Sequence, residues 1–161
     1  MGVAGFAKID ATTVLSTTGW SHMTTATSAF RWTKNYSVNI AVLDAQHQGL
    51  FATINELNNA LSSGQGAKVT ESVLKKLVKY ATTHFAAEEM LMTEHEFPGL
   101  ATHRAEHEKF GEKVGEFLAD YRAGKSGVPV SLMLFLHTWL KGHILTADKA
   151  YSSFLNARGV R

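Results

Sequence analysis

The chain has 161 residues, of which 45% are hydrophobic and 19% charged, a balance that suits a single domain with a substantial core. Its formal net charge of +2 is too weak to indicate nucleic acid or an acidic membrane surface as a partner. Cysteine is absent, which excludes disulfides and thiolate ligands.

The first 28 residues differ from the rest of the chain. They are rich in alanine, threonine, serine and glycine and show no helical periodicity. We therefore predict an N-terminal extension over residues 1–28 and one folded domain over residues 29–161. Within the extension, the segment Gly19–Met23 resembles a junction left by cloning, although a native linker would have the same composition. Both interpretations stay open at this point.

From the sequence we predict neither a secretion signal nor a membrane-spanning helix. Lys8 and Asp10 interrupt the N-terminus, and no apolar stretch of about 7–15 residues follows them. No segment approaches the roughly 18 uninterrupted apolar residues that a membrane-spanning helix needs. We therefore expect a cytoplasmic protein without membrane or nucleic-acid partners.

Between Phe30 and Val42, hydrophobic and polar residues alternate with a period of two, which is typical of extended chain. No turn-linked partner strand follows this stretch. It therefore predicts an extended arm packed along a helical body.

Helical periodicity begins at about Asp44 and returns in three later segments, in which hydrophobic residues recur at alternate spacings of three and four. Glycine-containing breaks follow the first and third segments, and Pro98 lies just beyond the second. Pro129 suits the first turn of the fourth segment. Because the connections are short, we predict an all-α fold, an antiparallel up-down-up-down four-helix bundle with an extended N-terminal arm.

Seven polar residues lie at one level of this predicted bundle, roughly 21–24 Å from the same end at 1.5 Å per residue. Six of them take seam positions, where a buried polar group costs free energy unless it is paired or coordinated. A set of five imidazoles and two carboxylates can hold two metal ions. The seven are His47, His84, Glu88, His103, His107, His143 and Asp148.

Asp148 fits this pattern least well. It follows His143 by five residues, which is about 140° around an ideal α-helix. Either the helix is distorted there or the carboxylate turns back toward the other ligands, and the spacing alone does not choose between them.

The ligand types in this set narrow the choice of metal. Without sulfur ligands, copper(I) and a structural zinc site are disfavoured. Two carboxylates can bridge a pair of divalent ions, and five histidines divide unevenly into three and two. With a solvent-derived oxygen as a third bridge, one octahedral iron would have six ligands and the other only five. The open position could accept a small diatomic ligand.

The spacing resembles that of the bacterial hemerythrins, a family of non-haem di-iron oxygen carriers. A lone histidine, His-x3-Glu, His-x3-His and His-x4-Asp occur in that order, and Trp32, Asp44–His47 and the Glu88–Glu89 pair are also similar. The resemblance covers about residues 30–157. It implies two non-haem iron ions with an oxo or hydroxo bridge, and reversible binding of dioxygen.

The resemblance also implies a role for each of the seven residues. One iron would have three histidines and six ligands, and the other two histidines and an open position for dioxygen. The first group is His103, His107 and His143, the second is His47 and His84, and the two bridges are Glu88 and Asp148.

Four hydrophobic residues are candidates for the walls of an oxygen pocket, although most would be core residues in any bundle. Ile144 is the best of them, because it lies next to His143 and four residues before Asp148. No general acid or base stands out among these apolar neighbours, so we expect a binding protein and not an enzyme. The four candidates are Phe51, Leu91, Trp139 and Ile144.

Two other functions remain open. One is an oxygen- or redox-sensing module of a larger signalling protein. The other is a di-iron oxidase or peroxidase, although such enzymes usually have glutamate-rich ligand sets. The sequence does not separate storage, delivery and sensing, and it leaves the oligomeric state open, a monomer included.

Several polar residues outside the seven receive separate predictions. We expect Glu89 to be solvated, since it points about 100° away from Glu88. Asp44 is a candidate either for the N-cap of the first helix or for an acceptor that orients an imidazole. The remaining histidines, His22, His95 and His137, are assigned no role.

Overall fold

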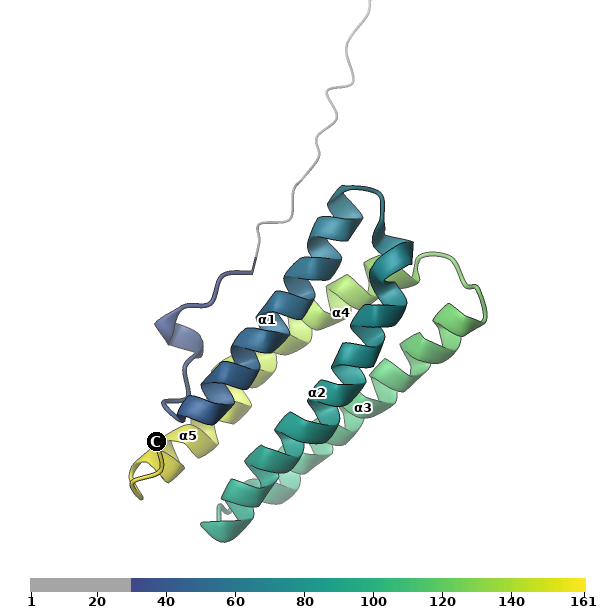
Figure 1. Cartoon of the computed structure of the whole chain (residues 1–161). Helices are drawn as coiled ribbons and strands as arrows, with labels where there is room; N and C mark the ends of the chain where they lie inside the picture. Colours follow the sequence, from purple (N-terminus) through teal and green to yellow (C-terminus); the bar gives the residue numbers. More distant parts are fainter. Residues whose placement is uncertain (1–29) are drawn as a thin grey trace, which may run out of the picture.

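The computed structural model describes residues 30–161, and the predicted extension over residues 1–28, with Gly19–Met23 and His22, lies outside the described residues. Every regular element in the described range is helical, and four antiparallel rods lie side by side (Figure 1). The predicted all-α four-helix bundle is therefore confirmed. The elements are η1 (Lys34–Tyr36), α1 (Ala41–Ser62), α2 (Gly66–Glu94), α3 (Leu100–Arg122), α4 (Val128–Gly142), η2 (His143–Asp148) and α5 (Lys149–Asn156).

The turns at one end of the bundle depend on glycines in left-handed conformations. Gly64 follows α1 with a φ of 71°, and Gly127 precedes α4 with a φ of 78°. Side chains with a Cβ rarely adopt this conformation, so glycine suits both positions. Pro129 lies in the first turn of α4, as its fixed φ favours.

The N-terminal arm differs in part from its prediction. The chain forms a short 3₁₀ turn at η1, and α1 begins at Ala41, so Val42 is helical and 56% exposed. The alternating pattern failed there because Val38, Ile40 and Leu43 are all buried across the point where extended chain becomes helix. Sequence alternation does not mark that point.

Side chains hold the arm in place of a partner strand. Asn55 on α1 accepts a hydrogen bond from the backbone N–H of Phe30 and donates one to its carbonyl, both at 2.8 Å. Asp44 accepts from the N–H of Val38 at 2.7 Å, and Asn156 on α5 donates to the Val38 carbonyl at 2.9 Å. Asp44 therefore anchors the arm, and the expectation that it caps α1 or orients an imidazole was wrong.

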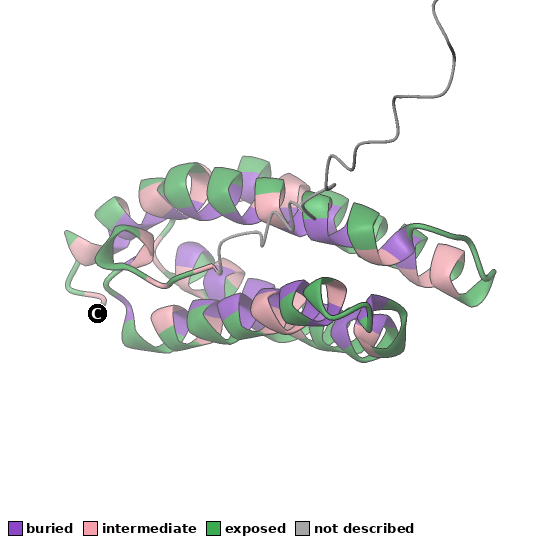
Figure 2. Ribbon diagram, turned by 90° about the horizontal axis from the view of Figure 1, so that it is seen from above, coloured by how far each residue is buried: buried purple, intermediate pink, exposed green. Residues whose placement is uncertain are grey.

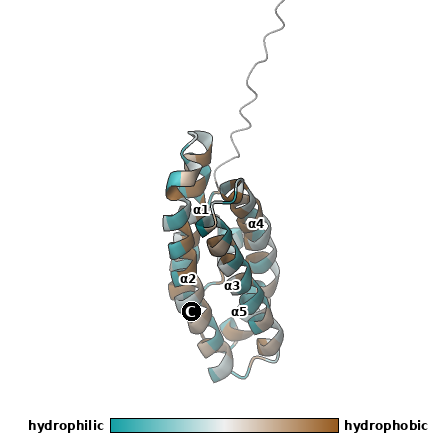
Figure 3. Cartoon of the chain, turned by 90° about the vertical axis from the view of Figure 1, so that its right-hand side faces the viewer, coloured by the Kyte–Doolittle hydropathy of each residue, from teal (hydrophilic) through white to brown (hydrophobic). Residues whose placement is uncertain are grey.

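Two hydrophobic clusters fill the interior. The helices turn their buried faces inward in Figure 2, and their apolar surfaces lie on the inner side in Figure 3. The larger cluster runs along the bundle, and the smaller joins the arm, the end of α2 and α5. In α1, His47 lies between Leu43 of the smaller cluster and Leu50 of the larger one. In α2, Glu88 lies between Phe85 and Met92 in the same way. The polar residues thus form a layer between two apolar regions.

The last helical rod has two unusual features. Residues His143–Asp148 form a π-helical turn that joins α4 to α5. By length and composition, the whole run Val128–Asn156 could cross a membrane. This is weak evidence for a span, because core helices pass the same test and the inner face of this run carries polar residues of the buried layer.

Candidate metal centre

All seven predicted residues meet inside the bundle. None of them is more than 4% exposed. One comes from α1, two from α2, two from α3 and two from η2, so each helical rod contributes at the same level, as the up-down connectivity requires. They are His47, His84, Glu88, His103, His107, His143 and Asp148.

The π-helical turn explains how Asp148 reaches the others. In a π-helix the hydrogen bond joins residues five apart, so residues at that spacing lie close to one face. His143 and Asp148 have this spacing, and the Nε2 atom of His143 lies 3.1 Å from Oδ1 of Asp148. Of the two possibilities left open by the sequence, distortion of the helix is the one observed.

The ligand atoms fall into two groups that share Glu88. One contains Glu88, His103, His107 and His143, and the other His47, His84 and Glu88, with the atoms of each group within 4.8 Å of one another. This division places three histidines on one side and two on the other.

Each carboxylate offers one oxygen to each group. Oε2 of Glu88 lies 3.1 Å from Nε2 of His107, whereas Oε1 lies 3.0 Å from Nε2 of His84. Asp148 is arranged likewise: Oδ1 faces His143, and Oδ2 lies 3.2 Å from Nε2 of His47. Two carboxylates in this orientation are suited to bridge a pair of metal ions.

Several buried atoms in the layer lack hydrogen bonds. They are both ring nitrogens of His47, Nε2 of His84 and both carboxylate oxygens of Asp148. Leaving a buried polar atom unpaired costs about 1–3 kcal/mol, and more when it is charged. Metal coordination would compensate for this cost, and imidazole and carboxylate are ligands that iron accepts. The residues therefore fit bound iron.

Three further side chains orient the imidazoles from outside. The amide oxygen of Gln46 lies 2.7 Å from Nδ1 of His84. Glu89 accepts from Nδ1 of His107 at 2.9 Å, and Glu106 from Nδ1 of His143 at 2.8 Å. Each contact leaves Nε2 directed toward the carboxylates.

The sequence interpretation missed these three residues, and the expectation that Glu89 is simply solvated was wrong. Glu89 also accepts from Nε of Arg104 at 2.8 Å. Each of the three is the chain neighbour of one of the seven, which was the available signal. A residue beside a ligand points to the flank of the helix, where it can reach the outer nitrogen of an imidazole on the next helix.

Tyr151 on α5 completes the surroundings of Glu88. Its hydroxyl donates to Oε1 of Glu88 at 2.5 Å. Burial and the nearby Glu88 and Asp148 raise the pKa of Tyr151 well above its ordinary value, so the hydroxyl keeps its proton. Burial alone would raise the pKa of Glu88, but the charge of His84 and hydrogen bonds from surrounding histidines hold it well below its ordinary value.

Aromatic rings stack on the imidazoles and limit their rotation. Phe85 lies parallel to His107 with ring centroids 3.7 Å apart. Trp139 stacks on His143 at 4.4 Å, and Tyr80 stacks on His84 at 4.5 Å.

The four predicted pocket residues separate into two places. Ile144 is fully buried in the larger cluster, which also holds Phe51 and is contacted by Trp139. Phe51 lies beneath the arm, with its ring 4.8 Å from that of Tyr36. Leu91 packs instead against the smaller cluster at the α5 end.

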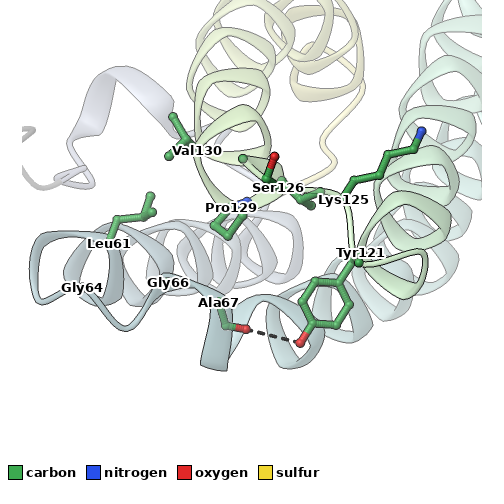
Figure 4. Close-up of a pocket in the computed structure, with 12 residues that line it drawn as sticks. Leu61, Gly64, Gly66, Ala67, Tyr121, Lys125, Ser126, Pro129 and Val130 are labelled. Atoms are coloured by element: carbon green, nitrogen blue, oxygen red, sulfur yellow. Dashed lines mark hydrogen bonds between the residues drawn. The ribbon is translucent and has the colours of Figure 1, made fainter.

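Two surface pockets lie near the bundle ends. One of about 490 Å³ lies between the α1–α2 and α3–α4 turns, where the Tyr121 hydroxyl donates to the carbonyl of Ala67 (Figure 4). It is remote from the polar layer. The other, of about 290 Å³, is lined by Phe97, Thr102, His103 and Glu106, among others, and opens beside the three-histidine group.

Comparison with known proteins agrees with this geometry. The sequence model of the hemerythrin HHE cation binding domain matches residues 38–155. The chain is 36% identical to a bacteriohemerythrin of Stenotrophomonas maltophilia over 126 residues, which covers 78% of this chain and 81% of that protein. It is 32% identical to a hemerythrin-like protein of Naegleria gruberi, over 82% of this chain and 98% of that one. A crystal structure of wild-type hemerythrin superposes with a TM-score of 0.71 at 28% identity, covering 78% of this chain and 97% of the other.

Proposed function

This chain belongs to the hemerythrin family, and from that premise we propose that it binds dioxygen reversibly at a non-haem di-iron centre, for oxygen storage, delivery or sensing. The observation that carries the proposal is the orientation of Glu88 and Asp148, each with one oxygen toward each histidine group. When bound, the pair of iron ions would supply the electrons that hold dioxygen. We expect this to occur in the cytoplasm.

The ligand roles proposed here follow the two groups. One iron is held by the three-histidine group and the other by His47 and His84, with Glu88 and Asp148 as bridges and an oxo or hydroxo bridge between the ions. The two-histidine iron keeps the open position for dioxygen. Support comes from the unequal division of the histidines and from the unpaired atoms of His47, His84 and Asp148.

The surroundings favour binding over turnover. Ile144 and Phe51 are buried and apolar, and we infer that they and Trp139 line the oxygen pocket. An apolar pocket excludes water and the protons that would release a reduced product. Leu91 is a weaker candidate, since it packs in the other cluster.

Visible spectroscopy tests the function directly. The di-ferrous protein is prepared without oxygen, exposed to oxygen, and then returned to an oxygen-free atmosphere. A coloured adduct that forms and then disappears supports a carrier or sensor. Immediate irreversible oxidation, with release of hydrogen peroxide or consumption of a reducing substrate, would instead favour an oxidase or peroxidase.

Replacing His47 with alanine is expected to abolish the coloured adduct while helical content, measured by circular dichroism, is retained. His47 is one of only two imidazoles in its group, and its loss leaves that iron with too few ligands. His95→Ala is the matched control, because it removes a histidine outside the seven. A His47→Ala protein that holds two irons and binds oxygen normally would refute the ligand assignment.

Shortening Ile144 to valine is expected to accelerate autoxidation several-fold, because the cavity admits water next to the centre. Ile54→Val is the control: it removes the same methylene from an equally buried site seven residues beyond His47. Both substitutions should cost about 0.5–1.5 kcal/mol of stability. Equal autoxidation rates in the two variants would remove Ile144 from the pocket.

A further inference from the structure

The outer nitrogens of the imidazoles have different partners on the two sides of the centre. On the three-histidine side, the carboxylates of Glu89 and Glu106 accept hydrogen bonds from His107 and His143. On the two-histidine side, the partner of His84 is the neutral amide of Gln46, and Nδ1 of His47 has no hydrogen-bond partner among the described residues. Among the contacts of the described residues, carboxylates therefore lie behind two histidines of the three-histidine group and behind neither histidine of the other.

This difference has a chemical consequence. A carboxylate that accepts the Nδ1 proton fixes the tautomer of the ring and makes its Nε2 a stronger donor to a metal. A hydrogen bond to a charged acceptor is roughly twice as strong as one between neutral groups. Stronger donors stabilise the higher charge of ferric iron more than that of ferrous iron.

The two carboxylates are not equivalent. The second oxygen of Glu89 accepts from Arg104, whose cation neutralises part of the charge available to His107. Glu106 has no such cation in the contacts of the described residues, and its side chain is 43% exposed beside the 290 Å³ pocket that also reaches His103. Arg104 thus offers a way to vary the charge of Glu89 without touching a ligand.

We propose that Glu89 and Glu106 are positioning residues that make the three-histidine iron the first to be oxidised and the more firmly held of the two. The proposal rests on the di-iron centre of the proposed function. In the step concerned, the ferrous ion that His103, His107 and His143 would hold would give one electron to an oxidant such as ferricyanide, which becomes ferrocyanide. The ion that His47 and His84 would hold would stay ferrous.

The test is an anaerobic redox titration of the di-ferrous protein and four variants. Glu89→Gln and Glu106→Gln keep the acceptor and the shape but remove the charge, so the potential of the first oxidation should rise. Arg104→Gln leaves Glu89 its full charge and should lower that potential. Gln46→Glu places a charge behind His84 and should narrow the gap between the two oxidation steps.

Iron retention gives a second readout. With a ferrous chelator in excess, Glu89→Gln and Glu106→Gln should lose iron about tenfold faster than the parent, the lower end of the usual effect of such partners. Circular dichroism checks that each variant is folded, which the partial exposure of all four side chains favours.

The outcomes are distinct. Potentials that move in opposite directions for Glu106→Gln and Arg104→Gln support the proposal, since a purely structural role gives no such sign change. Unchanged potentials and retention in both Gln variants overturn it. Because no oxygen is used, a protein that fails to bind oxygen but shows these shifts would refute the proposed function and leave this inference standing.

Discussion

A Glu88→Gln variant is expected to bind less than one iron ion per chain, where the proposed centre of the parent holds two, and to remain helical. Glu88 is fully buried, and its two oxygens face the two histidine groups separately. A neutral amide can offer an oxygen to only one group and turns N–H donors toward the other. This one isosteric change should therefore weaken the binding of both ions.

Iron content per chain and circular dichroism measure this result. Glu94→Gln is the control, because it makes the same change on the same helix at an exposed position. Two irons per chain in Glu88→Gln, at the affinity of the parent, would show that this carboxylate does not bridge the ions.

Removing the iron should lower the thermal midpoint of unfolding by about 10 °C or more. Ligands that bind only the folded state stabilise it by about 4 kcal/mol at a thousandfold excess over the dissociation constant, and each kcal/mol shifts the midpoint of a chain of this size by about 2–4 °C. The metal-free state also retains the unpaired buried atoms of His47 and Asp148.

Thermal unfolding of the metal-free and reconstituted proteins, followed by circular dichroism without oxygen, checks this expectation. The His47→Ala variant should gain less stability from iron than the parent does. If the metal-free protein unfolds at the same temperature as the iron-loaded one, metal binding does not stabilise the polar layer.

The sequence was informative wherever a residue's role follows from its position along one helix. Alternate spacings of three and four predicted the bundle, and His47, Glu88 and His107 were identified because they occupy seam positions normally held by hydrophobic residues. Their common level followed from connectivity alone. These are one-dimensional properties, so they can be read without knowledge of neighbouring helices.

Other features depend on contacts between elements and could not be read in this way. Glu89 was misjudged because its partner, His107, lies on another helix. Asp44 was misjudged because the arm backbone folds over its carboxylate, which no periodicity encodes. The π-helical turn is a third case, since spacing alone was compatible with a regular helix and a rotated side chain.

That turn accommodates one residue more than a regular α-helix would need between the two polar positions it carries. His143 and Asp148 lie five residues apart, whereas the corresponding pairs on α2 and α3 lie four apart and face the same layer. Leu145 and Thr146 are exposed in the turn, so packing constrains their identities little. Losing one of them would leave a four-residue spacing, which regular α-helical bonding keeps close to one face. A single-residue deletion here should therefore be tolerated better than a single-residue insertion, which would carry Asp148 about 100° further around the helix.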